Sequence, residues 1–93
     1  MLEVKLVGAE ACRRYRMMRA VVLDEASRTG VPIRLIEETE AAGILEYHTL
    51  NLPMLFIGGE QVAAGNPPSR KMVQERLAQR RETGQMAAQE QDR

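Results

Sequence analysis

The chain has 93 residues and a formal net charge of zero, which fits one small domain and argues against nucleic acid as the main partner. Aromatic residues make up only 3% of the chain, so we expect an aliphatic core. No apolar run approaches the length of a membrane span, so no membrane partner is expected. A single cysteine cannot form an internal disulfide, and no secretion signal is visible at the N-terminus. We therefore expect a cytoplasmic protein.

The first half of the chain predicts two strands and two helices. Residues 2–7 form a partly alternating apolar run, which indicates a strand. Residues 11–28 change to helical periodicity, and Gly30 suits the end of that helix. Its predicted inward face consists of Tyr15, Met18, Val22 and Ala26, widened by Met17 and Val21.

Residues 31–36 predict a second strand, and Pro32 places this strand at an edge of the sheet because proline cannot donate to a central ladder. Residues 39–47 predict a short helix, with Ala41, Ile44 and Leu45 facing inward.

The second half predicts a hairpin followed by a helix. Residues 54–57 form a continuous apolar run, as expected for a strand covered on both faces. Gly58 and Gly59 suit a tight turn into a return strand over residues 60–64. Residues 70–81 predict the last helix, with Ser69 as its N-cap and a thin apolar stripe made of Met72, Val73, Arg76 and Leu77.

The predicted order is therefore βαβαββα. It indicates an α/β fold with a central four-stranded mixed sheet and helices on both faces. We expect one domain over residues 1–82 and a frayed or disordered tail over residues 83–93, which is rich in Gln and Ala.

Cys12 is the most informative residue for function. It stands between the first strand and the first helix, and four arginines follow within seven residues: Arg13, Arg14, Arg16 and Arg19. A helix N-terminus and nearby cations both favour a thiolate over a thiol. The sequence thus predicts a thiol that ionises readily.

The element order, with its apolar strand after Asn51-Leu52-Pro53, resembles the thioredoxin fold. The likeness is greatest to the small glutaredoxin-like thioredoxins, also called redox-active disulfide proteins, over residues 2–77. Cys12 lies at the position of the nucleophilic cysteine. The family motif Cys-x-x-Cys reads Cys12-Arg13-Arg14-Tyr15 here, so Tyr15 replaces the resolving cysteine.

The resemblance also implies a binding surface. Pro53 corresponds to the family's cis-proline, which faces the active-site cysteine. Leu52 would offer its backbone to a bound peptide or to glutathione as an added strand. Arg13 or Arg14 could hold a glutathione carboxylate through a paired contact.

Several functions are compatible with these residues. In monothiol thiol–disulfide exchange, Cys12 would attack the disulfide of a protein or of glutathione, with glutathione as a possible co-substrate and no resident cofactor or metal. The alternative is a redox-inactive thioredoxin-fold binding or scaffold protein, so enzymatic activity stays open. An iron–sulfur cluster shared across a dimer is disfavoured, because such clusters need four ligands and the chain has one cysteine.

Three further residues or segments carry weaker signals. Tyr15 could hydrogen-bond toward Cys12 or serve as a core residue. His48, the single histidine, receives no role. The return strand at residues 61–64 could pair with a second copy of the chain, but the sequence does not give the oligomeric state.

Overall fold

In the computed structural model, residues 1–47 and 51–79 are described. Within these residues the chain forms four strands and three helices in the predicted order βαβαββα. The elements are β1 (Leu2–Val7), α1 (Arg13–Thr29), β2 (Ile33–Glu38), α2 (Ala41–Leu45), β3 (Met54–Ile57), β4 (Glu60–Ala64) and a helix whose described part is residues 70–79.

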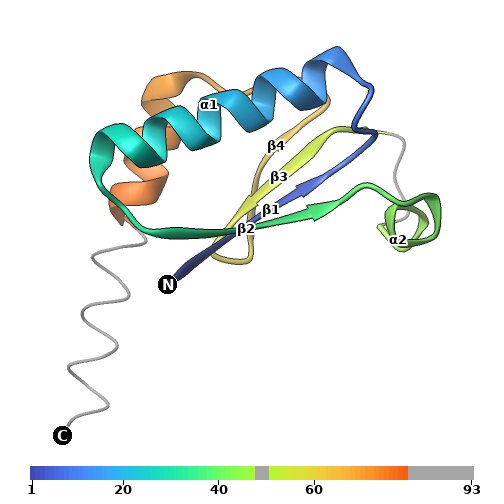
Figure 1. Ribbon diagram of the computed structural model, residues 1–93, viewed down its shortest axis with the longest axis horizontal. Helices are drawn as coiled ribbons and strands as arrows, with labels where there is room; N and C mark the ends of the chain where they lie inside the picture. The colour runs from blue at the N-terminus through green and yellow to red at the C-terminus, as the bar shows by residue number, and fades with distance from the viewer. Residues whose placement is uncertain (48–50, 80–93) are drawn as a thin grey trace, which may run out of the picture.

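The four strands form one mixed sheet in the order β2-β1-β3-β4 (Figure 1). Strand β1 pairs in parallel with β2 and antiparallel with β3, and β3 pairs antiparallel with β4. The prediction that the second strand lies at an edge is confirmed. The turn through Gly58 and Gly59 is also confirmed, with positive φ angles of 60° and 84°.

Strand β2 begins and ends two residues later than predicted. Pro32 precedes the strand and stays outside the ladder. Glu37 and Glu38 belong to it because β1 continues opposite them, with Leu6 paired to Glu37 and Val7 to Glu38. The sequence alone does not predict Glu37 and Glu38 as strand residues, because the β1 residues that pair with them lie about 30 positions earlier in the chain.

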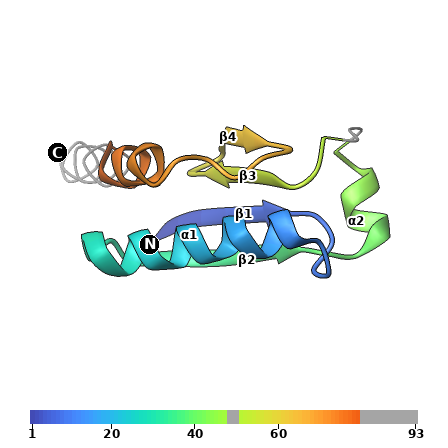
Figure 2. The same ribbon diagram turned by 90° about the horizontal axis from the view of Figure 1, so that it is seen from above.

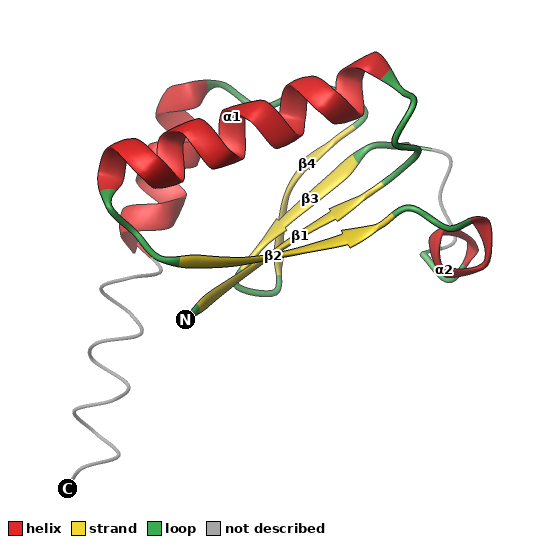
Figure 3. Cartoon of the chain, viewed as in Figure 1, coloured by secondary structure: helices red, strands yellow, loops and turns green. Residues whose placement is uncertain are grey.

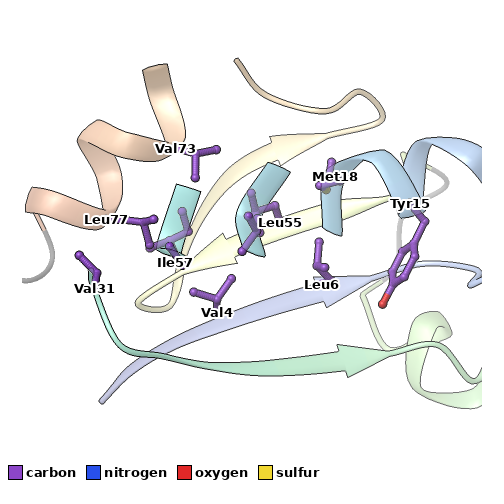
Figure 4. Packing of buried hydrophobic residues seen from close by; sticks show 11 residues of the cluster. Val4, Leu6, Tyr15, Met18, Val31, Leu55, Ile57, Val73 and Leu77 are labelled. Carbon is purple, nitrogen blue, oxygen red and sulfur yellow. The ribbon is translucent and has the colours of Figure 1, made fainter. Parts of the chain in front are cut away.

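One face of the sheet is covered by α1 and the helix at residues 70–79 (Figures 1 and 2). Between the helices and the sheet lies an aliphatic core with one tyrosine, shown in Figure 4. The predicted inward face of α1 is confirmed for Tyr15, Met18, Val22 and Ala26, all of which are buried. The prediction for Met17 is wrong, because this residue is 49% exposed. Met17 directly precedes the buried Met18 in the helix and therefore lies to one side of the buried stripe.

Helix α2 is shorter than predicted and buries none of its residues. It lies beyond the end of β2, at the opposite end of the molecule from both termini of the described chain (Figure 3). The predicted inward face is therefore wrong: Leu45 is 72% exposed, and Ala41 and Ile44 are not buried. Five residues form little more than one turn, and no part of the core lies beneath them.

Ser69 caps the last helix, as predicted. Its Oγ accepts a hydrogen bond of 3.1 Å from the backbone N–H of Met72. Val73 and Leu77 are fully buried, whereas Met72 is 40% exposed and does not belong to the core stripe. The predicted tail, residues 83–93, lies outside the described residues.

A buried carboxylate joins the two helices. Glu25 of α1 is completely buried, and its Oε1 and Oε2 accept hydrogen bonds from Gln74 Nε2 at 2.7 Å and Arg70 Nη1 at 3.2 Å. Arg70 also pairs with Asp24. Position 25 lies on the inward stripe, three residues after Val22, so the spacing contained a signal for this contact.

Candidate functional site

Three loops meet at one end of the sheet. Because β3 runs antiparallel to both of its neighbours, Val7 at the end of β1 pairs with Met54 at the start of β3, which pairs with Ala64 at the end of β4. The loops that follow β1, precede β3 and follow β4 therefore emerge together. They carry Cys12, Pro53 and Gly65.

Cys12 occupies the N-cap position of α1. Its backbone N–H donates to Ala9 at 2.9 Å, and its carbonyl oxygen accepts the first helical hydrogen bond from Arg16 at 3.1 Å. The side chain is free and half-buried. This geometry fixes the thiol at the positive end of a helix of 17 residues.

The environment of Cys12 lowers the pKa of its thiol below the ordinary value. The largest cause is hydrogen bonding from the backbone N–H of Tyr15, followed by that of Arg14. Partial burial opposes this shift, and the positive charges of Arg14 and Arg16 add to it. The thiolate is therefore favoured mainly by the first turn of the helix and only secondarily by the arginines.

Pro53 is fully buried, and the Leu52–Pro53 peptide bond is cis. The carbonyl oxygen of Pro53 accepts a hydrogen bond of 2.8 Å from the Gly65 N–H, which ties the loop before β3 to the loop after β4. A Cβ built on Gly8 would lie 3.1 Å from Pro53 Cβ and 3.1 Å from Tyr15 Cδ2. The loop leading to Cys12 thus packs between Pro53 and Tyr15. Leu52 is half-buried beside them.

The four arginines have different surroundings. Arg14 Nη1 lies 3.4 Å from the Gly65 carbonyl oxygen, a long contact that a ligand could replace. Arg16 donates to Ala11, and Arg19 pairs with Glu37 at 3.0 Å. Arg13 is exposed. The sequence predicted Arg13 and Arg14 as binding residues. Of the four arginines, these two have the fewest or weakest contacts within the described residues.

Sequence reasoning missed the partner of Tyr15. The tyrosine is completely buried, and its hydroxyl donates a hydrogen bond of 2.8 Å to Glu37 Oε1 rather than to Cys12. Burial, followed by this hydrogen bond, raises the pKa of the hydroxyl well above its ordinary range. The signal available in the sequence was the tyrosine itself, since a buried hydroxyl normally needs a partner.

A separate hollow of about 230 Å³ lies on the opposite face of the sheet. Its lining includes Glu3 and Lys5, which alternate along β1 with the core residues Val4 and Leu6. Tyr47 and Phe56 form a tilted aromatic pair there, with ring centroids 5.8 Å apart. This hollow does not belong to the Cys12 site.

Neither a metal site nor a membrane span is found in residues 1–47 and 51–79. No group of three or more His, Cys, Asp or Glu side chains there could hold an ion. None of the helices in the same residues is both long and apolar enough to cross a bilayer. His48 lies outside the described residues.

Comparison with known proteins agrees with this architecture. A family model described as a thioredoxin domain matches residues 2–78. The crystal structure of a selenoprotein W-related protein from Vibrio cholerae is similar with a TM-score of 0.57 and 12% sequence identity, covering 84% of this chain and 94% of that chain. At this identity the likeness concerns the fold alone. No curated protein matches the sequence.

Proposed function

Because the chain belongs to the thioredoxin domain family, we propose that it carries out monothiol thiol–disulfide exchange through Cys12. The observation that carries this proposal is the position of Cys12. Its half-buried side chain stands at the N-terminus of α1, where the amides of Tyr15 and Arg14 lower the pKa of the thiol. A thiolate is the attacking species in such exchange.

The reaction has two steps. The Cys12 thiolate attacks the glutathione sulfur of a mixed disulfide, a Cys12–glutathione disulfide forms, and the other sulfur leaves as a thiolate that takes up a proton. The thiolate of a second glutathione then attacks this adduct, which releases glutathione disulfide and regenerates the Cys12 thiolate. Glutathione supplies the two electrons, so the proposed setting is a reducing compartment such as the cytoplasm.

An external thiol is required because Tyr15 stands three residues after Cys12, where a resolving cysteine would otherwise lie in the helix. The exposed Arg13 and the weakly held Arg14 are proposed to bind a glutathione carboxylate. The main chain of Leu52 is proposed to pair with the backbone of the bound peptide, next to Pro53.

The test is reduction of a glutathionylated peptide by glutathione, with the wild-type protein compared to Cys12→Ser. The wild type should accelerate turnover and form a Cys12–glutathione adduct visible by mass spectrometry. Equal rates for the two proteins, together with no adduct, would contradict the proposal.

The second candidate is a redox-inactive protein that binds a partner on the same surface. It is favoured by the complete burial of Tyr15, which fills the second motif position with a side chain unable to exchange disulfides. In that case Cys12→Ser would leave partner binding unchanged, and Arg14→Ala would weaken it.

A further inference from the structure

The contact between Tyr15 and Glu37 joins the first turn of α1 to the end of β2. Tyr15 is the third residue of α1, and Glu37 is the fifth residue of β2. The 2.8 Å hydrogen bond therefore spans 22 residues of sequence and connects two elements that meet only in the folded protein.

The tyrosine is held both at its ring and at its hydroxyl. Its ring packs close to Gly8, where a Cβ would lie 3.1 Å from Cδ2, and its side chain has no exposed surface. Glu37 is in turn fixed by Arg19 Nε at 3.0 Å, one turn further along α1. Glu37 Oε1 thus receives donors from two positions of the same helix.

The backbone of Tyr15 is part of the Cys12 site. Tyr15 follows the N-cap residue Cys12 by three positions, so its N–H is one of the first-turn donors that have no partner within the helix, and it helps to lower the pKa of the thiol. The direction of an N–H bond is set by the backbone, and the backbone of a first helical turn is held by few intrahelical hydrogen bonds. Anchoring the side chain of Tyr15 therefore also fixes the direction of this N–H.

We propose that Glu37 is a positioning residue for Cys12. By accepting the hydrogen bond from the Tyr15 hydroxyl, Glu37 holds the first turn of α1 in the orientation in which the amides of that turn face the Cys12 sulfur. The inference rests on the proposed function for its purpose, but the ionisation of Cys12 is measurable without any disulfide substrate. A failure of exchange with normal Cys12 ionisation would count against the function and leave this inference intact.

Charge and positioning predict opposite effects when Glu37 is removed. Loss of a negative charge by itself can only favour the Cys12 thiolate, so it lowers the pKa of the thiol or leaves it unchanged. Loss of positioning disfavours the thiolate and raises the pKa of the Cys12 thiol. Arg14 and Arg16, the charges that act on Cys12 most strongly, are unchanged in such variants.

The experiment measures the rate of Cys12 alkylation by iodoacetamide as a function of pH. The midpoint of this profile reports ionisation independently of the intrinsic nucleophilicity of the thiolate. Tyr15→Phe and Glu37→Leu should each move the midpoint upward by about half a unit or more. Glu37→Gln, whose amide oxygen still accepts the Tyr15 hydroxyl, should stay near wild type or shift slightly downward.

Two controls keep the result interpretable. Tyr47→Phe removes a hydroxyl from the opposite face of the sheet and should leave the midpoint unchanged. Circular dichroism and urea denaturation identify any variant that is not folded; Tyr15→Phe conserves the buried ring and should fold. A folded Tyr15→Phe with an unchanged midpoint, or a downward shift in Glu37→Leu, would overturn the proposal.

Discussion

Gly8 lies so close to Pro53 that even a methyl group at this position would crowd the proline: a Cβ on Gly8 would lie 3.1 Å from Pro53 Cβ and 3.3 Å from Pro53 Cα. The same Cβ would lie 3.1 Å from the ring of Tyr15. Such distances are shorter than ordinary van der Waals contacts between carbon atoms. The close approach brings the loop before Cys12 against the proline loop.

Gly8→Ala should therefore destabilise the protein by about 1–3 kcal/mol, the usual cost of overpacking a rigid site. It should also move the midpoint of Cys12 alkylation, because Tyr15 must shift. Urea denaturation and the alkylation profile measure the two effects. Gly30→Ala is the matched control. The left-handed backbone at Gly30, with φ of 69°, disfavours a side chain by roughly 1–2 kcal/mol, but no atom lies within 4 Å of the new Cβ. A shift of the Cys12 midpoint in the control would contradict this explanation.

The pH dependence of Cys12 should follow the groups that lower the pKa of its thiol. The alkylation rate should rise with pH through a midpoint below that of an unperturbed cysteine, which is about 8.5. Arg14→Ala and Arg16→Ala should each raise this midpoint only slightly, since both variants keep the backbone hydrogen bonds, which are the larger causes of the lowered pKa. Added salt should raise it slightly by screening the arginines. A midpoint at or above 8.5 in the wild type would refute the description of the site.

Glu25 should matter for stability far more than its neighbouring surface charges. Glu25→Ala removes a fully buried carboxylate and leaves the Gln74 amide without its acceptor, at an expected cost of about 1–3 kcal/mol. Arg28→Ala breaks only the exposed pair with Asp24, and the expected cost is below about 0.5 kcal/mol. Denaturant midpoints of the two variants provide the comparison. Equal losses would show that Glu25 does not join the two helices.

The cap of the last helix gives a further test. Ser69→Ala removes the oxygen that accepts the Met72 N–H and should cost about 1 kcal/mol. Ser69→Asp supplies an equivalent acceptor and should restore most of the stability. Thermal denaturation of the three proteins measures the effect. If Ser69→Asp is as unstable as Ser69→Ala, the loss does not come from capping.

Much of the fold could be predicted because most of its strands and its long helix are defined by patterns of neighbouring residues in the sequence. The bounds of β1, β3 and β4 agree with the apolar runs and with the Gly58-Gly59 turn. The helical stripe from Tyr15 to Ala26 predicted which side of α1 is buried. Helix α2 was misjudged because an apolar pattern does not reveal whether a core lies beneath it.

The site could be predicted only in part. The position of Cys12 followed from its place between a strand and a helix. The role of Glu37 could not be foreseen, because it depends on the parallel register that sets Glu37 opposite Leu6. Glu25 was overlooked for a related reason: a charged residue on an inward stripe becomes acceptable only when Arg70 and Gln74 reach it from another helix.

The helix amides that face Cys12 also couple folding to proton release. Unfolding separates them from the sulfur and returns the thiol to its ordinary acidity, so the folded state gives up this proton at lower pH than the unfolded state. This contribution to stability is fully present above the unfolded pKa and is lost as pH falls through the folded one. A disulfide adduct on Cys12 abolishes the titration, so occupation of the site makes the stability of the domain less dependent on pH.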